Sequence, residues 1–346
     1  MSNETAPVRP DEEMDWAALA AYLEQHIPAA AGPMRVAQFP GGSANLTYLV
    51  CFGDLELVVR RPPLGPVAPG AHDMAREHRV LSRLYRQFPL APRSYHLCAD
   101  PAVLGAPFIV VERRVGVVVR DAFPAAMRCH EQLAARTSAA LVDAMAQLHN
   151  VDPARCDLTD LGKPDGFVAR QLGGWKKRWE LAQDQPHPLM DEIHSRLSAA
   201  IPQPQRVSLL HNDLKLDNCQ FDPADPDHVT SIFDWDMATL GDPLVDLGTL
   251  LGYWPEPEDP APRAIRPEGA DDPFPSRAEV VARYAAATGL DTRHSDWYQA
   301  FALWKTAVVV QQIYIRYKRG QTRDERFAHI ADRIPILVEQ ARPLLD

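Results

Sequence analysis

The sequence predicts an α+β protein with a small β-rich lobe followed by a larger, mainly helical lobe. Two observations place strands early: paired β-type runs fill residues 47–60, and another apolar run covers 107–112. A third is that helical spacing dominates later, over 131–149 and 297–319. With 346 residues there is room for two lobes. The pattern changes from β-type to helical near 113–118, so we expect the two lobes to cover residues 1–115 and 116–346.

The first strands form a predicted hairpin. The stretch 47–60 contains two β-type runs around Gly53, and glycine at the first turn position suits a type II′ turn. Antiparallel pairing then places Arg60 opposite Thr47. Arg60 is therefore expected beside the residues that precede Thr47, which are Gly41, Gly42, Ser43, Ala44 and Asn45.

The stretch 71–85 predicts the one helix of the small lobe. Met74, Glu77, Leu81 and Leu84 recur at helical spacing and share one face. Glu77 interrupts this otherwise apolar face. Because a carboxylate that points into a core is costly unless it is paired, Glu77 needs a cationic partner.

The densest group of polar side chains surrounds a second predicted hairpin, with strands over 219–221 and 229–233 and a turn over 222–227. An antiparallel pair brings its outer ends together, so Asn218 and Asp234 are expected at the same open end. Asp213 lies in the loop that leads there. An amide oxygen and two carboxylates suit a hard cation such as Mg²⁺ beside a reacting hydroxyl.

Composition limits the possible partners. The chain has 36 basic and 46 acidic residues, a net charge of −10, which argues against nucleic-acid binding or a polybasic membrane contact. Its five cysteines show no C-x-x-C pair, the first residues lack an apolar signal core, and no run approaches the length of a membrane span. These features predict a cytoplasmic protein. The proline-rich stretch 255–275 is expected to be irregular and to cover a surface.

The order H-x-D-x-x-x-x-N over His211–Asn218, followed by a strand-end Asp, resembles the catalytic loop and metal-binding Asp of protein kinases. The fuller pattern LHNDLKLDNCQF…IFDWDMATLGDPLVDLG is similar to the aminoglycoside phosphotransferase family, in particular the sub-branch related to domains fused to acyl-CoA dehydrogenases. FPGGSANLTYLV, LVVRRPP, AREHRVL and FVARQLGGWKKRW also match, so the resemblance spans roughly residues 35 to 320. Signatures of P-loop NTPases, α/β-hydrolases and dinucleotide-binding folds are absent from the sequence.

The resemblance implies a two-lobed protein-kinase-like fold that transfers a phosphoryl group from ATP, with GTP not excluded, to a hydroxyl of a small molecule. Asp213 would act as the general base, and Asn218 and Asp234 would hold Mg²⁺. Arg60 replaces the usual phosphate-positioning Lys and would pair with Glu77. The remaining nucleotide contacts would come from Gly41, Gly42, Ser43 and Asn45 over the phosphates and from Glu112 and Arg113 beside the adenine.

The acceptor is less constrained. The sub-branch suggests a hydroxyacyl compound, and the alternatives are an antibiotic phosphotransferase or a pseudokinase that binds nucleotide without turnover. The basic run 176–178 either is a solvated helix face or reaches an anionic group, and the aromatic stripe over 297–319 is either core or a binding face. Candidate acceptor residues are Asp236, Arg170, Arg178, Lys305, Gln312 and Arg316. The sequence predicts no oligomeric state.

Two further residues are expected to support the catalytic loop. His211 should pack and hydrogen-bond within the loop and take no part in acid–base chemistry. Asp246 should tether the loop backbone.

Overall fold

The computed structural model describes residues 4–40, 45–65, 72–254, 256–260, 267–322 and 324–346. Its contacts divide the chain into two compact units. The first unit comprises Met1–Gly116, Ala154–Leu158 and Thr230–Ala238, and the second comprises Val117–Pro153, Thr159–Val229 and Thr239–Asp346. The short segment 230–238, which contains Asp234 and Asp236, thus belongs to the β-rich unit.

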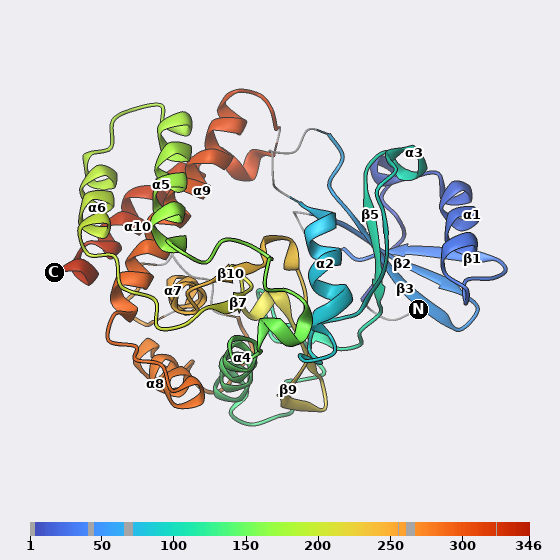
Figure 1. Cartoon of the computed structure of the whole chain (residues 1–346), viewed down its shortest axis with the longest axis horizontal. Coiled ribbons are helices and arrows are strands. Elements are labelled where there is room, and N and C mark those ends of the chain that lie inside the picture. The colour runs from blue at the N-terminus through green and yellow to red at the C-terminus, as the bar shows by residue number, and fades with distance from the viewer. Residues whose placement is uncertain (1–3, 41–44, 66–71, 255, 261–266, 323) are drawn as a thin grey trace. The chain divides into compact units, whose positions relative to one another are not determined.

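The first unit is built on an antiparallel sheet of five strands in the order β1-β2-β3-β5-β4, with helices on both faces (Figure 1). Its strands are β1 (Met34–Gln38), β2 (Leu46–Phe52), β3 (Leu55–Arg61), β4 (Ser94–Cys98) and β5 (Phe108–Glu112). Its helices are α1 (Trp16–His26), α2 (Met74–Leu84) and α3 (Pro101–Leu104). The predicted strand–helix–strand order of 47–112 is confirmed, but the prediction of a single helix in this lobe is wrong, because α1 and α3 also belong to it.

Strand β3 presents different residues to the two faces of the sheet because side chains alternate along a strand. Leu57 and Val59 join the core beneath α1, whereas Arg60 points to the face that carries α2. The predicted hairpin is confirmed: Thr47 pairs with Arg60, and Gly53 has a φ of 57°. The sheet therefore delivers Arg60 to the buried face of α2.

The second unit is mainly helical, and α9 (Ser295–Lys318) runs through its centre (Figure 1). Trp297, Phe301 and Trp304 of α9 are buried, so the aromatic stripe is core. Helix α7 approaches α9 closely at Gly248, where a Cβ would lie 2.5 Å from the backbone oxygen of Tyr298. The other helices are α4 (Leu133–His149), α5 (Phe167–Ala182), α6 (Pro188–Ala199), α7 (Leu244–Tyr253), α8 (Arg277–Thr288) and α10 (Arg333–Ala341). Within the described ranges, no helix has both the length and the apolar character that crossing a membrane requires.

The hairpin after the catalytic loop has a shorter turn than predicted. Strand β8 covers Cys219–Asp222 and β9 covers Asp225–Ile232, so two residues turn the chain where the sequence predicted six. Pro226 misled the prediction, since proline interrupts central strands. Here it lies in β9, at the edge of the sheet β6-β8-β9, where a missing N–H is tolerated. The remaining strands are β6 (Val117–Val118), β7 (Ser208–Leu210) and β10 (Thr239–Gly241).

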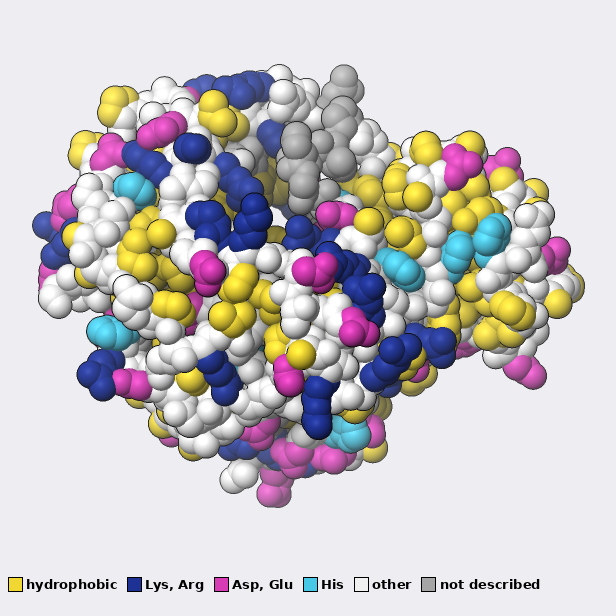
Figure 2. Space-filling view, in the orientation of Figure 1, with side chains coloured by type: hydrophobic (Ala, Val, Ile, Leu, Met, Phe, Trp, Pro, Cys, Tyr) yellow, Lys and Arg dark blue, Asp and Glu magenta, His cyan; other side chains and the backbone are white. Residues whose placement is uncertain are grey.

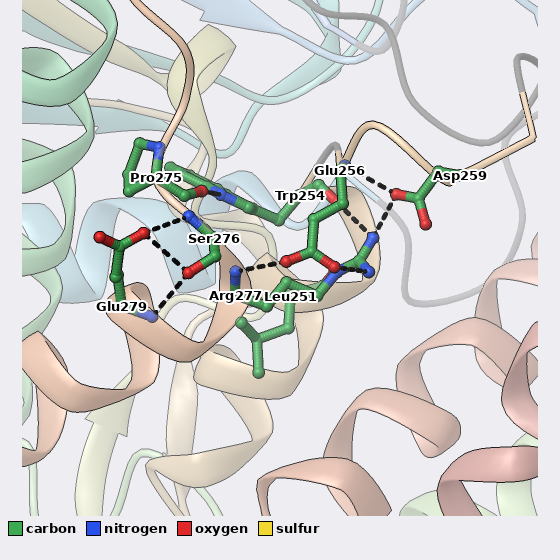
Figure 3. Close-up of polar contacts among 8 residues, drawn as sticks. All are labelled: Leu251, Trp254, Glu256, Asp259, Pro275, Ser276, Arg277 and Glu279. Carbon is green, nitrogen blue, oxygen red and sulfur yellow. Dashed lines mark hydrogen bonds and ion pairs between the residues drawn. The ribbon is translucent and has the colours of Figure 1, made fainter.

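The proline-rich stretch before α8 is anchored by Arg277. Figure 3 shows carboxylates and carbonyls converging on its guanidinium. Nη1 lies 2.7 Å from Glu256, Nη2 contacts Asp259 and the carbonyl of Trp254, and Nε donates to the carbonyl of Leu251. Next to it, the side chains and backbone N–H groups of Ser276 and Glu279 cap α8 reciprocally. The described ends of this irregular stretch are therefore fixed to the helical unit.

Candidate functional site

A buried ion cluster lies in the first unit, and we call it the Arg60 cluster (Arg60, Glu77, Asp234 and Asp236). Nε of Arg60 lies 3.1 Å from Oε1 of Glu77, and Nη2 lies 2.9 Å from Oδ1 of Asp234. Three elements bring these groups together: β3, the buried face of α2 and the residues that follow β9. The cationic partner expected for Glu77 is thus Arg60.

The Arg60 cluster contains more negative than positive charge. Burial raises the pKa of Glu77 to about 7, against the opposing effect of Arg60, and Asp234 and Asp236 raise it further. Burial acts to lower the pKa of Arg60, but the same three carboxylates outweigh it and the pKa is raised. Oε2 of Glu77 is buried without a hydrogen-bond partner in the described part of the chain. Within these four residues, one guanidinium pairs with two carboxylates and feels the charge of a third.

Asn45 and His72 border this cluster. Nδ2 of Asn45 donates to Oδ1 of Asp234 at 3.5 Å, and Oδ1 of Asn45 lies 3.0 Å from Nδ1 of His72. The same His72 nitrogen lies 3.9 Å from Asp236. Asp234 itself adopts a φ of 72°, a left-handed backbone that Asp and Asn tolerate better than most residues. Gly41, Gly42 and Ser43 lie outside the described residues.

Glu112 and Arg113 end β5 and begin the segment that leaves the sheet. The side chain of Glu112 accepts a hydrogen bond from the N–H of Arg93 at 3.0 Å and pairs with Arg114 at 3.1 Å. Arg113 contacts Glu4 and stacks over the ring of Phe39 at 5.2 Å. Both side chains are thus engaged in local structure, and the backbone N–H of Glu112 donates to the carbonyl of Arg93 at 2.8 Å.

The catalytic loop of the second unit positions Asp213. Nδ2 of Asn218 donates to Oδ2 of Asp213 at 3.1 Å and to its carbonyl at 2.8 Å. Nζ of Lys215 lies 3.3 Å from the same Oδ2 and 3.6 Å from Asp217. The amide nitrogen of Asn218 is used in these two hydrogen bonds. Its Oδ1 can therefore accept a hydrogen bond or ligate a cation.

A buried carboxylate fixes the backbone of this loop, as predicted for Asp246. Its two oxygens accept the N–H groups of His211 and Asn212, both at 2.7 Å. Oδ2 also lies 3.2 Å from Nε2 of His149, whose Nδ1 lies 2.6 Å from the hydroxyl of Tyr284. Burial would raise the pKa of Asp246, but these donors outweigh it and the pKa is lowered. The ionised carboxylate thus stays paired while it holds the loop.

His211 and Asn212 show why the loop needs such a tether. His211 is fully buried, and its Nδ1 accepts the N–H of Asp213 at 3.3 Å, which agrees with the structural role expected for it. Asn212 has a φ of 69°. This left-handed conformation costs free energy unless surrounding contacts maintain it.

The predicted acceptor residues do not all come together. Arg178 of α5 lies 4.2 Å from the ring centre of Trp175, and Nζ of Lys305 on α9 lies 5.5 Å from it. Arg170 instead donates to the carbonyls of Lys163 and Asp165 and so closes the loop before α5. Gln312 and Arg316 follow Lys305 along α9 by two and three turns, about 10 and 16 Å away.

Three residues near the loop escaped the sequence prediction. Lys215 was visible in the motif but had no assigned role. Its ammonium also lies 5.0 Å from the ring centre of Tyr253, and a spacing of two residues from Asp213 could have indicated it. Trp175 and Tyr253 carried no such signal, because only the packing of α5 and α7 against α9 brings them into this region.

The comparisons with known proteins concern the family and the fold of the chain. Residues 35–289 match the phosphotransferase enzyme family. Acyl-CoA dehydrogenase family member 11 of Mus musculus is 30% identical over 98% of this chain, but the match covers only 44% of that protein.

Two solved structures share the fold. A protein of Ralstonia eutropha JMP134, provisionally named an aminoglycoside phosphotransferase, superposes with a TM-score of 0.79 at 28% identity, over 96% of this chain and 98% of that one. Choline kinase of Cryptosporidium parvum Iowa II gives a TM-score of 0.65 at 13% identity, over 96% and 97%. The resemblance inferred from the motifs is confirmed: the chain has the two-lobed kinase-like α+β fold and belongs to the phosphotransferase enzyme family.

Proposed function

We propose that this protein transfers the terminal phosphoryl group of ATP, with Mg²⁺, to a hydroxyl of a small metabolite. The observation that carries the proposal is the environment of Asp213. Its carboxylate is oriented by Asn218 and Lys215, and its loop is fixed by Asp246. A general base in phosphoryl transfer needs this kind of positioning because the reaction depends on geometry and electrostatics.

Asn218 and Asp234 are the proposed magnesium ligands. The described residues contain no group of three or more His, Cys, Asp and Glu side chains that could hold a metal ion. A nucleotide kinase needs no such group, since Mg²⁺ is commonly held by one or two protein oxygens together with phosphates and water. The negative excess of the Arg60 cluster and the available Oδ1 of Asn218 fit this chemistry. When bound, the ion would neutralise charge on the phosphates.

The nucleotide would be held by groups of the first unit. Arg60 can grip phosphate and carboxylate oxygens at once through its planar guanidinium. The loop residues Gly41, Gly42, Ser43 and Asn45 would cover the phosphates, and the backbone of Glu112 and Arg113 would contact the base. For the acceptor we propose a hydroxyacyl compound, since the mouse relative joins a matching region to a longer chain named for acyl-CoA dehydrogenation.

The test is ADP release measured with a panel of acceptors: hydroxy acids, hydroxyacyl-CoAs, an aminoglycoside, a macrolide and choline. A hydroxyacyl compound should stimulate release, and Asp213→Asn should lower kcat by about 10²- to 10⁴-fold while ATP binding, followed by calorimetry, persists. Asp217→Asn is the matched control, because Asp217 also contacts Lys215 but is more exposed. Its kcat should stay within about threefold of wild type.

The outcomes separate the alternatives. Stimulation by the aminoglycoside or macrolide alone would replace the proposed acceptor with an antibiotic. Nucleotide binding without stimulation by any acceptor would indicate a pseudokinase. Faster release with GTP than with ATP would change the nucleotide but leave the role of Asp213 in place.

A further inference from the structure

Two cations share one indole ring in the second unit, and we call this group the Trp175 cluster (Trp175, Arg178 and Lys305). The guanidinium carbon of Arg178 lies 4.2 Å from the ring centre and the ammonium of Lys305 lies 5.5 Å from it. The ring stabilises each cation through its negative face. It supplies no formal charge, so the repulsion between the two cations remains.

Neither cation has a carboxylate partner within the described residues, whereas Lys176 and Lys318 of the same two helices do. On α5, Lys176 pairs with Asp191 and lies 3.7 Å from Glu180. On α9, Lys318 pairs with Asp184 at 2.6 Å. Basic side chains of these two helices gather on one face of the larger unit (Figure 2). The cations of the Trp175 cluster are thus left to find an anion elsewhere.

The electrostatics of Lys305 agree with an unfilled anion site. Burial lowers the pKa of Lys305 and Arg178 lowers it further, while Asp213 and Asp246 oppose the change. An anion placed between the two cations would relieve both their repulsion and the cost of burying the ammonium.

Helix α5 leaves space beside this cluster. Gly173 and Gly174 lie in the middle of the helix, where glycine is less favourable than alanine. A Cβ at either position would meet no atom within 4 Å, so packing within the described chain does not require glycine. Gly174 lies one turn before Arg178, on the same helical face. Both glycines are exposed, so this space opens to solvent and a ligand can enter it.

The Trp175 cluster lies close to the catalytic loop. Lys305 is near enough to Asp213 for that carboxylate to raise its pKa. Helix α7 packs against α9, and its Tyr253 contacts Lys215 of the loop through its ring. A small molecule held at Trp175 could therefore reach Asp213 with another of its groups.

We propose that Trp175, Arg178 and Lys305 form a subsite for an anionic group of the acceptor, a carboxylate or a phosphate, and that Gly174 provides the space for it. This inference rests on the proposed function, because it names the class of acceptor used by the same site. Arg178 would grip the anion through its planar donors and Lys305 through its charge. A cationic acceptor such as choline would be repelled here.

The experiment measures KM and kcat for three acceptors: a short-chain hydroxy acid, its neutral methyl ester and its CoA thioester. Arg178→Gln and Lys305→Met should each raise KM for an anionic acceptor about tenfold with kcat within about twofold, and should leave KM for the methyl ester and for ATP unchanged. Lys177→Gln, the same charge change one residue away on an exposed side chain, should have no effect. A selective effect on the free acid identifies a carboxylate as the ligand, and an effect on the thioester identifies phosphate.

Gly174→Ala tests whether the acceptor uses the space beside Gly174. It should raise the melting temperature, since alanine favours the helix, and yet raise KM for the anionic acceptor. A higher melting temperature with unchanged KM would overturn the assignment of that space to the acceptor.

Unchanged KM values in Arg178→Gln and Lys305→Met would overturn the subsite while leaving the kinase activity in place. If no acceptor stimulates ADP release, the proposed function fails separately. In that case, calorimetric titration of wild type and both variants with the hydroxy acid tests the subsite by itself. Binding that is lost in the variants supports the subsite, and equal or absent binding overturns it.

Discussion

The Arg60 cluster and the Trp175 cluster are opposite solutions to placing charge beside a reaction. In the first, one guanidinium pairs with Glu77 and Asp234, and Asp236 is close enough to raise its pKa. In the second, two cations share a ring and no described carboxylate pairs with them. The first has excess negative charge and the second excess positive charge. Each imbalance is unfavourable in the isolated chain and favourable once a ligand of the opposite sign is bound.

Burial separates Arg178 from the Arg60 cluster, although Lys305 is itself half-buried. Only 1% of the Glu77 side chain and 12% of the Arg60 side chain are exposed, whereas Arg178 is an exposed residue. Water screens exposed charges and leaves buried ones strongly coupled. Changes in the Arg60 cluster should therefore affect the stability of the fold, and changes at Arg178 should affect mainly ligand binding.

The largest effect is expected from Arg60→Met. It leaves Glu77 and Asp234 without their shared cation, and removing one partner of a buried ion pair costs about 3–5 kcal/mol of unfolding free energy. Urea denaturation at pH 8, where Glu77 is mostly ionised, measures the loss. Arg60→Met combined with Glu77→Gln should recover a large part of it. A loss below about 1 kcal/mol in the single variant would show that the cluster behaves like surface charge.

Asp246→Asn tests whether burial alone makes the unfolding free energy sensitive to the loss of a charged group. Asp246 is fully buried, but its oxygens accept well-formed hydrogen bonds. Asparagine can accept at only one of those oxygens and places a donor against the other N–H, so we expect a loss of about 3 kcal/mol. The same variant should lower kcat, because the loop around Asp213 loses its tether. Full kcat with normal stability would contradict the tethering role.

The pH dependence of stability isolates Glu77. Its pKa is raised to about 7 in the folded chain from a usual value of 4.5. Between these values the folded state keeps a proton that the unfolded state has lost, so stability falls as pH rises through this window, by up to about 1.4 kcal/mol per pH unit. Urea denaturation of wild type and Glu77→Gln at pH 5, 6 and 7 should show a steeper fall in wild type. Parallel curves would mean that Glu77 stays ionised throughout.

The Arg60–Glu77 pair was predicted from the family resemblance, and local patterns predicted only where each of its two residues lies. Hairpin register fixes the neighbours of Arg60, and helical spacing fixes the face on which Glu77 lies. The tether at Asp246 was anticipated from its place after the catalytic loop, and contacts to two loop N–H groups confirm it. Where the chain contradicted local rules, as at Pro226, the prediction failed, since strand position in a sheet is not a local property.

The Trp175 cluster shows what the sequence could not supply. Arg178 and Lys305 were both candidates, but nothing in either helix indicates that they meet at one ring. That contact depends on how α5 packs against α9, which is decided by many apolar contacts between residues far apart in the chain. Arg170 had the same local signal as Arg178 and folds back on its own loop.

Raising the salt concentration should affect the two clusters differently, and this effect should be the smallest of the four. Between about 0.05 and 0.5 M NaCl the Debye length falls several-fold, so the attraction between Arg178 and an approaching anion is screened much more strongly. KM for an anionic acceptor should rise about threefold, because Arg178 attracts it through solvent. The stability difference between wild type and Arg60→Met should stay nearly constant, because Arg60 and Glu77 are largely buried. Measuring both quantities in the same buffers makes the comparison internal. An acceptor KM that ignores salt, together with a stability difference that shrinks with it, would reverse the assignment of exposed and buried charge to the two clusters.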